Sequence, residues 1–192
     1  MEQIDKECLA RYRQGDVDAL GELMEEYRRP LFGFILKMTE GRDEAEEVFQ
    51  EVWIRAIRHL GTFKNRRFLS WLFRIAHNVI IDRARKKKPD LSLQDRSSED
   101  GAAWEERTPS SERSPADVAG DADMKRRIER AVDQLPPEQK AVFVMRAEGD
   151  LPFKEIARIQ RTSINTALAR MHYALNKLRV ELADEYARTD RR

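Results

Sequence analysis

The sequence predicts an all-α protein with two small helical domains joined by a flexible linker. Apolar residues recur three or four positions apart along most of the 192-residue chain. This spacing is typical of amphipathic helices, and the alternating pattern of a half-buried strand is nearly absent. Over residues 89–122 the periodicity disappears, and Ser, Pro, Asp, Glu and Gly dominate. Such a composition favours a disordered segment, so we place the domains at residues 1–88 and 123–187.

The first domain contains a run of predicted helices. The first helix carries the only cysteine, Cys8, on its apolar side, where we expect a buried small side chain and no disulfide. Asp16 is a candidate N-cap of the next helix, which Pro30 is expected to kink or restart. Asp43 is a candidate cap of a third helix with unbroken apolar spacing. A fourth helix is predicted at about residues 67–87.

The second domain is predicted to contain a helix-turn-helix. Helices resume after the linker, stop at Pro136 and restart beyond it. A short helix at 153–159 is followed by a turn and by a longer helix, for which Ser163 or Thr162 is the candidate cap. These proportions are those of a helix-turn-helix, although a helical hairpin that does not bind DNA has similar ones. The side chains expected on its outward face are Asn165, Thr166, Ala169, Arg170 and Tyr173.

The charge distribution indicates two separate contacts with a polyanion. The net charge of the chain is only +1, but residues 63–90 carry +7 and residues 124–192 carry +5. An acidic segment precedes each basic block. Residues 1–62 carry −5, and residues 91–123, which separate the two blocks, carry −6. Two basic blocks of this kind favour nucleic acid as a ligand. The alternative, that the charges are only solvated helix faces, stays open.

The more basic segment, residues 63–88, also alternates aromatic residues with arginines. One side of its predicted helix, at spacings of three and four, holds Trp71, Arg74, Asn78, Asp82 and Arg85. Unstacked single-stranded bases need a stacking surface, edge hydrogen bonds and phosphate neutralisation, and this combination offers all three. The alternative is that all four aromatic side chains are buried in the hydrophobic core, and we expect two of the four to be buried there. These four are Phe63, Phe68, Trp71 and Phe73.

Catalytic and membrane functions find little support in the sequence. His59, His77 and His172 form no ligand pair, and no glycine-rich phosphate loop or nucleophile elbow is present. We therefore expect no catalytic residue, metal or cofactor. No stretch is long and apolar enough to span a bilayer, and the acidic N-terminus differs from a signal peptide. We expect a cytoplasmic protein.

Several segments together resemble the sigma-70 superfamily, specifically its small extracytoplasmic-function (ECF) group. The segment DEAEEVFQEVW at 43–53 is similar to region 2.2 of the family. The segment FLSWLFRIAHN at 68–78, with Asp82-Arg83, is similar to regions 2.3 and 2.4. The segments LPPEQKAVF at 135–143 and EIA at 155–157 are similar to region 4. The resemblance covers nearly everything except the linker and the last few residues. It implies a sigma region 2-like domain, a linker in place of region 3, and a region 4-like helix-turn-helix domain.

The resemblance also implies a function and its residues. An ECF sigma factor binds core RNA polymerase through the β′ clamp and the β flap, recognises the −10 and −35 promoter elements and promotes melting. An anti-sigma factor is the further partner implied. Contacts with the polymerase clamp are expected from Asp43, Glu46, Glu47, Gln50 and Glu51. Contacts with the −10 element are expected from Lys64, Asn65, Arg66, Arg67, Trp71, Phe73, Arg74, Asn78, Arg83 and Arg85. Contacts with the −35 element are expected from Ser163, Asn165, Thr166 and Arg170.

The chain departs from the family pattern in the region 4 turn and recognition helix. Arg161 and Asn165 stand where the family often has glycine, and Leu168 stands where it often has lysine. A left-handed arginine costs about 1–2 kcal/mol where glycine costs little, which leaves the shape of the turn open. Two other functions stay as alternatives. One is a duplex-binding regulator that works without polymerase, and the other is a helical nucleic-acid enzyme such as a nuclease.

Overall fold

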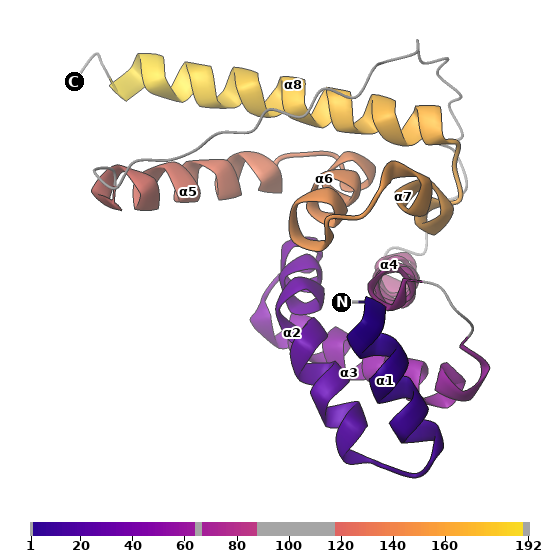
Figure 1. Cartoon of the computed structure of the whole chain (residues 1–192). Helices are drawn as coiled ribbons and strands as arrows, with labels where there is room; N and C mark the ends of the chain where they lie inside the picture. Colours follow the sequence, from indigo (N-terminus) through magenta and orange to yellow (C-terminus); the bar gives the residue numbers. More distant parts are fainter. Residues whose placement is uncertain (1, 64–66, 88–117, 190–192) are drawn as a thin grey trace.

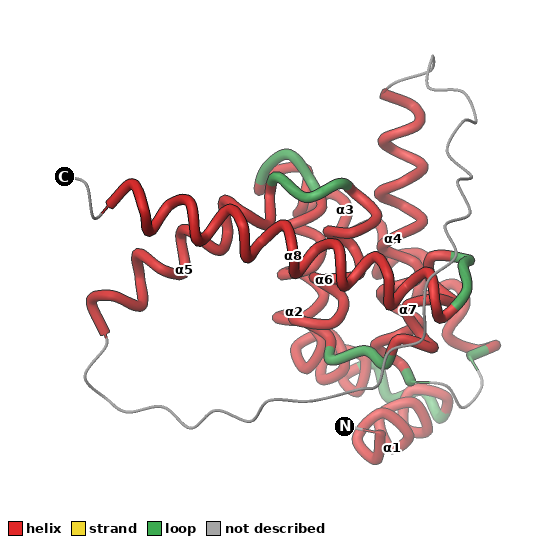
Figure 2. The backbone as a smooth tube through the Cα atoms, turned by 90° about the horizontal axis from the view of Figure 1, so that it is seen from above, coloured by secondary structure: helices red, strands yellow, loops and turns green. Residues whose placement is uncertain are grey.

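The structure is a computed structural model that describes residues 2–63, 67–87 and 118–189 (Figure 1). Every regular element in these ranges is a helix (Figure 2), which confirms the predicted all-α class. The first unit contains α1 (Glu2–Arg13), α2 (Asp18–Met38), α3 (Arg42–His59), the 3-10 helix η1 (Leu60–Thr62) and α4 (Phe68–Lys87). The second contains α5 (Val118–Asp133), α6 (Pro137–Gly149), α7 (Phe153–Gln160) and α8 (Ile164–Thr189).

The helix signals of the first unit are largely local. The Asp16 carboxylate accepts the backbone N–H groups of Asp18 and Ala19 at 3.0 and 3.4 Å, so it caps the start of α2 as predicted. Pro30 lies inside α2, which continues unbroken, so the predicted restart is wrong. The third helix begins at Arg42, two residues earlier than a cap at Asp43 predicts, and no side chain caps it. Asp43 lies instead in its first turn, where a carboxylate favours the helix dipole.

The second unit starts earlier than the sequence predicts. The first turn of α5 lies at Val118, inside the expected linker, and residues 88–117 lie outside the described part of the chain. Pro137 occupies the first turn of α6, where its missing N–H costs no helical hydrogen bond. In Figure 1, α5 runs alongside α8, and the short helices α6 and α7 lie between this pair and the first unit.

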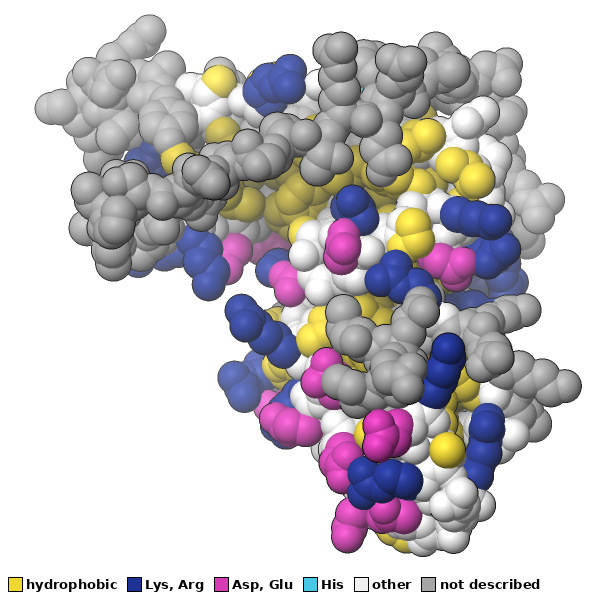
Figure 3. All heavy atoms as spheres, in the orientation of Figure 1, with side chains coloured by type: hydrophobic (Ala, Val, Ile, Leu, Met, Phe, Trp, Pro, Cys, Tyr) yellow, Lys and Arg dark blue, Asp and Glu magenta, His cyan; other side chains and the backbone are white. Residues whose placement is uncertain are grey.

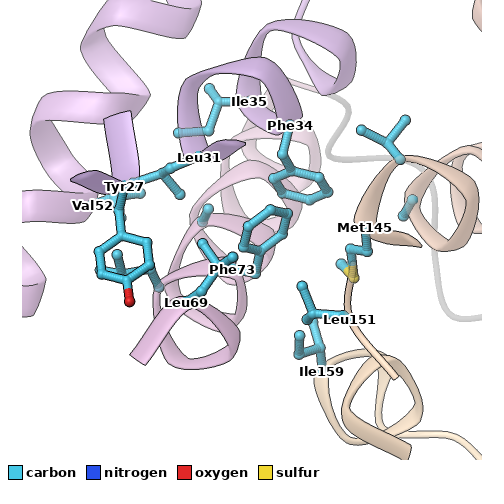
Figure 4. Packing of buried hydrophobic residues seen from close by; sticks show 14 of the residues in the cluster. Tyr27, Leu31, Phe34, Ile35, Val52, Leu69, Phe73, Met145, Leu151 and Ile159 are labelled. Atoms are coloured by element: carbon cyan, nitrogen blue, oxygen red, sulfur yellow. The ribbon is translucent and has the colours of Figure 1, made fainter. Parts of the chain in front are cut away.

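The two units share one hydrophobic core, whereas the sequence predicts two separate domains joined by a flexible linker. Helix α2 packs against α6, and α4 packs against α7. Figure 4 shows Phe34 and Phe73 of the first unit facing Met145, Leu151 and Ile159 of the second. All five side chains are at most 3% exposed. The core therefore continues from one unit into the other.

Candidate nucleic-acid and polymerase interfaces

The helix-turn-helix is built by α7, a short turn and the start of α8. Ile156, Ala157 and Ile159 bury one face of α7. The helix ends at Arg161, which adopts a left-handed conformation with φ 55° and ψ 43°. The turn therefore keeps the glycine-type geometry although it carries an arginine. Ser163 Oγ accepts the Thr166 N–H at 3.0 Å, so Ser163 caps α8.

The four residues expected at the −35 element gather at the N-terminal end of α8. Ser163 and Asn165 are exposed, whereas Thr166 and Arg170 are half-buried. The guanidinium of Arg170 donates to Gln160 Oε1 at 2.7 Å, and this contact holds it against α7. The Ser163 hydroxyl is used as the helix cap. Among these four residues, Asn165 therefore offers an exposed side-chain amide that can contact a base.

Three of the four aromatic side chains of residues 63–88 are buried. Phe63, Phe68 and Phe73 are at most 8% exposed, and only Trp71 of the four is partly accessible. The Trp71 ring lies 4.8 Å from the Phe63 ring, centroid to centroid. Phe73 is fully buried and packs on Phe34 at 4.8 Å. We therefore correct its assignment: Phe73 is a core residue and offers no surface to a base.

The remaining −10 candidates lie along the accessible side of α4. Arg74 and Arg85 are exposed, and Arg67 and Asn78 are half-buried. Trp71, Arg74, Asn78 and Arg85 follow one another at helical spacing, so α4 does bring them onto one side. Arg83 is paired with α3, and the last three candidates lie outside the described residues. These are Lys64, Asn65 and Arg66.

One contact that supports this site was missed in the sequence. The Arg13 guanidinium, at the end of α1, donates to the backbone carbonyl of Phe63 at 2.8 Å. Phe63 stands immediately before residues 64–66, so Arg13 fixes the point where that segment begins. No local pattern predicts the contact, because fifty positions separate the two residues.

The acidic residues of α3 and the basic end of α4 neutralise each other. Arg83 forms ion pairs with Glu47 and Glu51, both at 2.9 Å, and Lys87 pairs with Glu44 at 2.7 Å. The hydrogen bond from Lys87 holds the pKa of Glu44 below its ordinary value. Acidic and basic side chains lie interspersed on the visible face of this unit (Figure 3). A pocket of about 420 Å³ between the two helices is lined by Glu44, Glu47, Arg83, Lys86 and Lys87.

The expected clamp-binding residues also lie on α3. Asp43, Glu46, Glu47 and Gln50 are exposed. Glu51 is half-buried, and its carboxylate contacts Arg55 as well as Arg83. The helix thus presents an acidic surface whose inner edge is already paired with the basic end of α4.

The two candidate DNA surfaces meet at His77. This α4 side chain is largely buried, and burial lowers its pKa to about 4, with the positive charges of Arg170 and Arg161 acting in the same direction. Its Nδ1 atom has no hydrogen-bond partner among the described residues. The recognition helix and the −10 helix therefore lie close enough to influence each other electrostatically.

The described residues contain neither a candidate metal site nor a membrane-spanning helix. No group of three or more His, Cys, Asp or Glu side chains there could hold a metal ion. None of the helices described is long and apolar enough to cross a membrane.

A helix-turn-helix that follows a separate helical unit is an arrangement found in DNA-binding proteins. The family model for Sigma-70 region 2 matches residues 23–89, and the model for Sigma-70 region 4 matches residues 125–178. The chain is 30% identical over 186 residues to the ECF RNA polymerase sigma factor SigW of Bacillus subtilis, covering 96% of this chain and 100% of SigW. It belongs to the ECF group of the sigma-70 family.

Other comparisons agree. The ECF RNA polymerase sigma factor RpoE of Cereibacter sphaeroides is 31% identical over 173 residues, which covers 88% of each chain. The sigma factor RpoE in complex with the anti-sigma factor NepR from Bartonella quintana has a similar fold, with a TM-score of 0.65 and 20% identity. That match covers 87% of this chain and 98% of the other. CnrH in complex with the cytosolic domain of CnrY gives the same score and identity, covering 94% and 98%.

Proposed function

We propose that this chain directs core RNA polymerase to promoters as an ECF sigma factor. It binds the core enzyme, recognises the −10 and −35 elements and promotes melting of the promoter. The observation that carries the proposal is the order of three features in one chain. An acidic helix, α3, precedes an aromatic and basic helix, α4, and a helix-turn-helix follows at the other end of the sequence.

The acidic face of α3 suits a basic partner, and we assign it to the β′ clamp of the polymerase. The second unit would contact the β flap. Asp43, Glu46, Glu47 and Gln50 are all exposed, although Glu46 is paired with Arg42 and Glu47 with Arg83. Glu51 would have to exchange its contacts with Arg55 and Arg83 for contacts with the clamp.

For the −10 element, Trp71 supplies the accessible aromatic face and Asn78 supplies an amide that can pair with a base edge. Arg67, Arg74 and Arg85 supply cations for phosphates. Since Arg83 is already paired with Glu47 and Glu51, it reaches a phosphate only after those contacts open.

For the −35 element, the start of α8 is the part of the chain that would enter the major groove. Short polar groups and a guanidinium at this position can reach base edges. Asn165 and Arg170 are the two side chains assigned to base reading, because the Ser163 hydroxyl is used as the cap. Thr166 lies beside them.

Sigma factors are non-catalytic transcription initiation factors, and we infer that this chain has no enzymatic activity of its own. We place it in the cytoplasm, where its polymerase and promoters are found. An anti-sigma factor is a further expected partner, because a solved sigma factor of similar fold, RpoE, is bound to the anti-sigma factor NepR. Recovery of only core polymerase in pull-downs from unstressed cells would contradict this partner.

Run-off transcription on genomic DNA tests the function directly. Core polymerase with the purified chain is expected to start at a defined set of promoters that core polymerase alone does not use, and mapping of the 5′ ends identifies them. A duplex-binding regulator would bind DNA but confer no promoter-dependent initiation. A nuclease would cleave the template in a divalent-dependent way, which the same reaction without nucleotides reveals.

A further inference from the structure

Helix α1 packs along α2 and is attached to it near both ends (Figure 1). The buried Asp5 carboxylate accepts a hydrogen bond from the Tyr27 hydroxyl of α2. Nearer the other end of the helix, the Arg11 guanidinium donates to both carboxylate oxygens of Glu22 at 2.8 and 2.9 Å. Leu9, between these two contacts, is 6% exposed. A side chain in the last turn of α1 is therefore carried by a helix that is fixed in place.

Arg13 extends from this last turn to a segment fifty positions away. Its Nη2 atom donates to the Phe63 backbone carbonyl at 2.8 Å. The Phe63 N–H donates to the Leu60 carbonyl at 3.2 Å, where η1 ends. Both backbone polar groups of Phe63 are thus bonded, the N–H within its own turn and the carbonyl to α1. Because a charged donor makes a stronger hydrogen bond than a neutral one, the contact with Arg13 restrains the Phe63 backbone.

The Phe63 side chain carries this restraint to the −10 surface. Its ring lies 4.8 Å from the Trp71 ring and 5.3 Å from the Phe68 ring, centroid to centroid. Phe63 is 8% exposed and Phe68 is fully buried, whereas Trp71 keeps an accessible face. Phe63 and Phe68 are therefore the two rings that support the indole on which a base would stack.

The placement of this indole matters because a base leaves the duplex stack before it contacts the protein. Unstacking costs free energy, and a stacking surface on the protein offsets part of that cost. A ring that must first be ordered offsets less, since ordering a side chain at an interface costs entropy. A residue that holds Trp71 in place can therefore affect promoter melting although it touches no base.

We propose that Arg13 is a positioning residue of the −10 site, and that it acts through Phe63 on the Trp71 ring. This inference rests on the proposed sigma function and adds a residue to that site. The match to the Sigma-70 region 2 model begins at residue 23, so α1 and Arg13 lie outside the matched segment. The support of the −10 surface thus includes a helix to which no role is otherwise assigned.

Fluorine NMR tests the structural step without polymerase or DNA. The full chain labelled with 5-fluorotryptophan carries three indole labels, and Trp71→Phe assigns the signal of interest. Arg13→Ala is expected to shift or broaden the Trp71 signal and to leave that of the buried Trp53 in place. Lys6→Ala is the matched control, because it removes a positive charge from an exposed position of the same helix. A Trp71 signal that responds no more to Arg13→Ala than to Lys6→Ala overturns the proposal.

A double-mutant cycle tests the functional step with core polymerase. Arg13→Ala is expected to slow open-complex formation about threefold to tenfold while binding to core stays unchanged. Permanganate reactivity of promoter thymines measures the first quantity, and fluorescence anisotropy measures the second. In a Trp71→Ala background the same substitution is expected to slow melting less than twofold further, because the ring on which Arg13 acts is gone. Arg11→Ala is the control for docking of α1, because it removes the contact with Glu22 and leaves Arg13 present.

Three results of the cycle overturn the proposal. If Arg13→Ala slows melting by the same factor with and without Trp71, the two residues act independently. If Arg11→Ala slows melting as much as Arg13→Ala does, the effect comes from the docking of α1 in general. If Arg13→Ala flattens the salt dependence of promoter binding, Arg13 contacts a phosphate. A parent chain that forms no open complex counts against the sigma function, whereas the Trp71 signal reports the positioning contact independently.

Discussion

At the scale of single residues, the aromatic cluster of α4 divides its members by exposure. Trp71 keeps an accessible face while Phe63 and Phe68 pack beneath it at 4.8 and 5.5 Å. Asn78 lies two turns further along the same side of the helix. The Trp71 indole and the Asn78 amide are therefore already positioned on one helix before DNA binds. This preorganisation lowers the entropy cost of holding an unstacked base.

Trp71→Ala and Asn78→Ala are therefore expected to impair open-complex formation more than holoenzyme assembly. Loss of one stacking or base-edge contact costs about 1–3 kcal/mol. Permanganate reactivity of promoter thymines measures melting, and fluorescence anisotropy measures binding to core. Phe73→Ala is the contrasting variant, with an expected loss of about 3–5 kcal/mol in unfolding free energy from the cavity it leaves. Equal loss of core binding in the Trp71 and Asn78 variants would mean that both residues are structural.

Arg170 is expected to act on base sequence. Replacing it with Ala should cost about 1–3 kcal/mol and relax the preference at one −35 position. Joint replacement of Lys86, Lys87 and Lys88 should instead weaken all promoters alike and flatten the salt dependence, because fewer counterions are released on binding. Competition binding over a set of −35 variants at several salt concentrations separates the two effects. If Arg170→Ala weakens every sequence equally and changes the salt slope, Arg170 is a phosphate contact.

At the scale of elements, the helix-turn-helix holds its shape at a local cost. The turn needs a left-handed residue after α7, and Arg161 provides it with φ 55° although its side chain disfavours this conformation. The Thr162 N–H donates to the Ala157 carbonyl at 2.9 Å and closes the turn. The packing of Ile156 and Ile159 therefore dictates the conformation that the arginine adopts.

Arg161→Gly should therefore stabilise the chain. Glycine removes the left-handed strain of about 1–2 kcal/mol, and its greater freedom in the unfolded state returns roughly 0.5–1 kcal/mol, so we expect a net gain below about 1.5 kcal/mol. Denaturant unfolding measures it. Arg161→Ala keeps the β-carbon and removes the same charge, so it should show no such gain. A gain of the same size in both variants would assign the effect to charge.

At the scale of the whole molecule, the sequence predicts features that depend on neighbouring residues, and it misses contacts between residues far apart in the chain. The Asp16 and Ser163 caps, the burial of Cys8 and the helix-turn-helix follow from nearby residues, and the structure confirms each of them. The ion pair of Lys37 with Glu148, 111 positions away, has no signal in the sequence. The family resemblance implies a role for Phe73 at the −10 element, whereas its side chain is buried in the shared core.

The stability of the folded molecule should depend on pH through His77. Burial holds its folded pKa at about 4, whereas the unfolded residue titrates near 6.5. Between these values the unfolded chain binds the extra proton, so stability is fully present above pH 6.5 and falls as the pH drops toward 4.

The comparison that isolates this effect is the parent chain against His77→Phe, which keeps an apolar ring and cannot titrate. Denaturant unfolding between pH 7 and 5 should show a loss of stability in the parent that is much smaller in the variant. This window lies above the range in which lowered carboxylate pKa values, such as that of Glu44, come into play. Parallel pH profiles for the two chains would show that His77 stays neutral or titrates alike in both states, and the pH dependence of stability would then have to come from other groups.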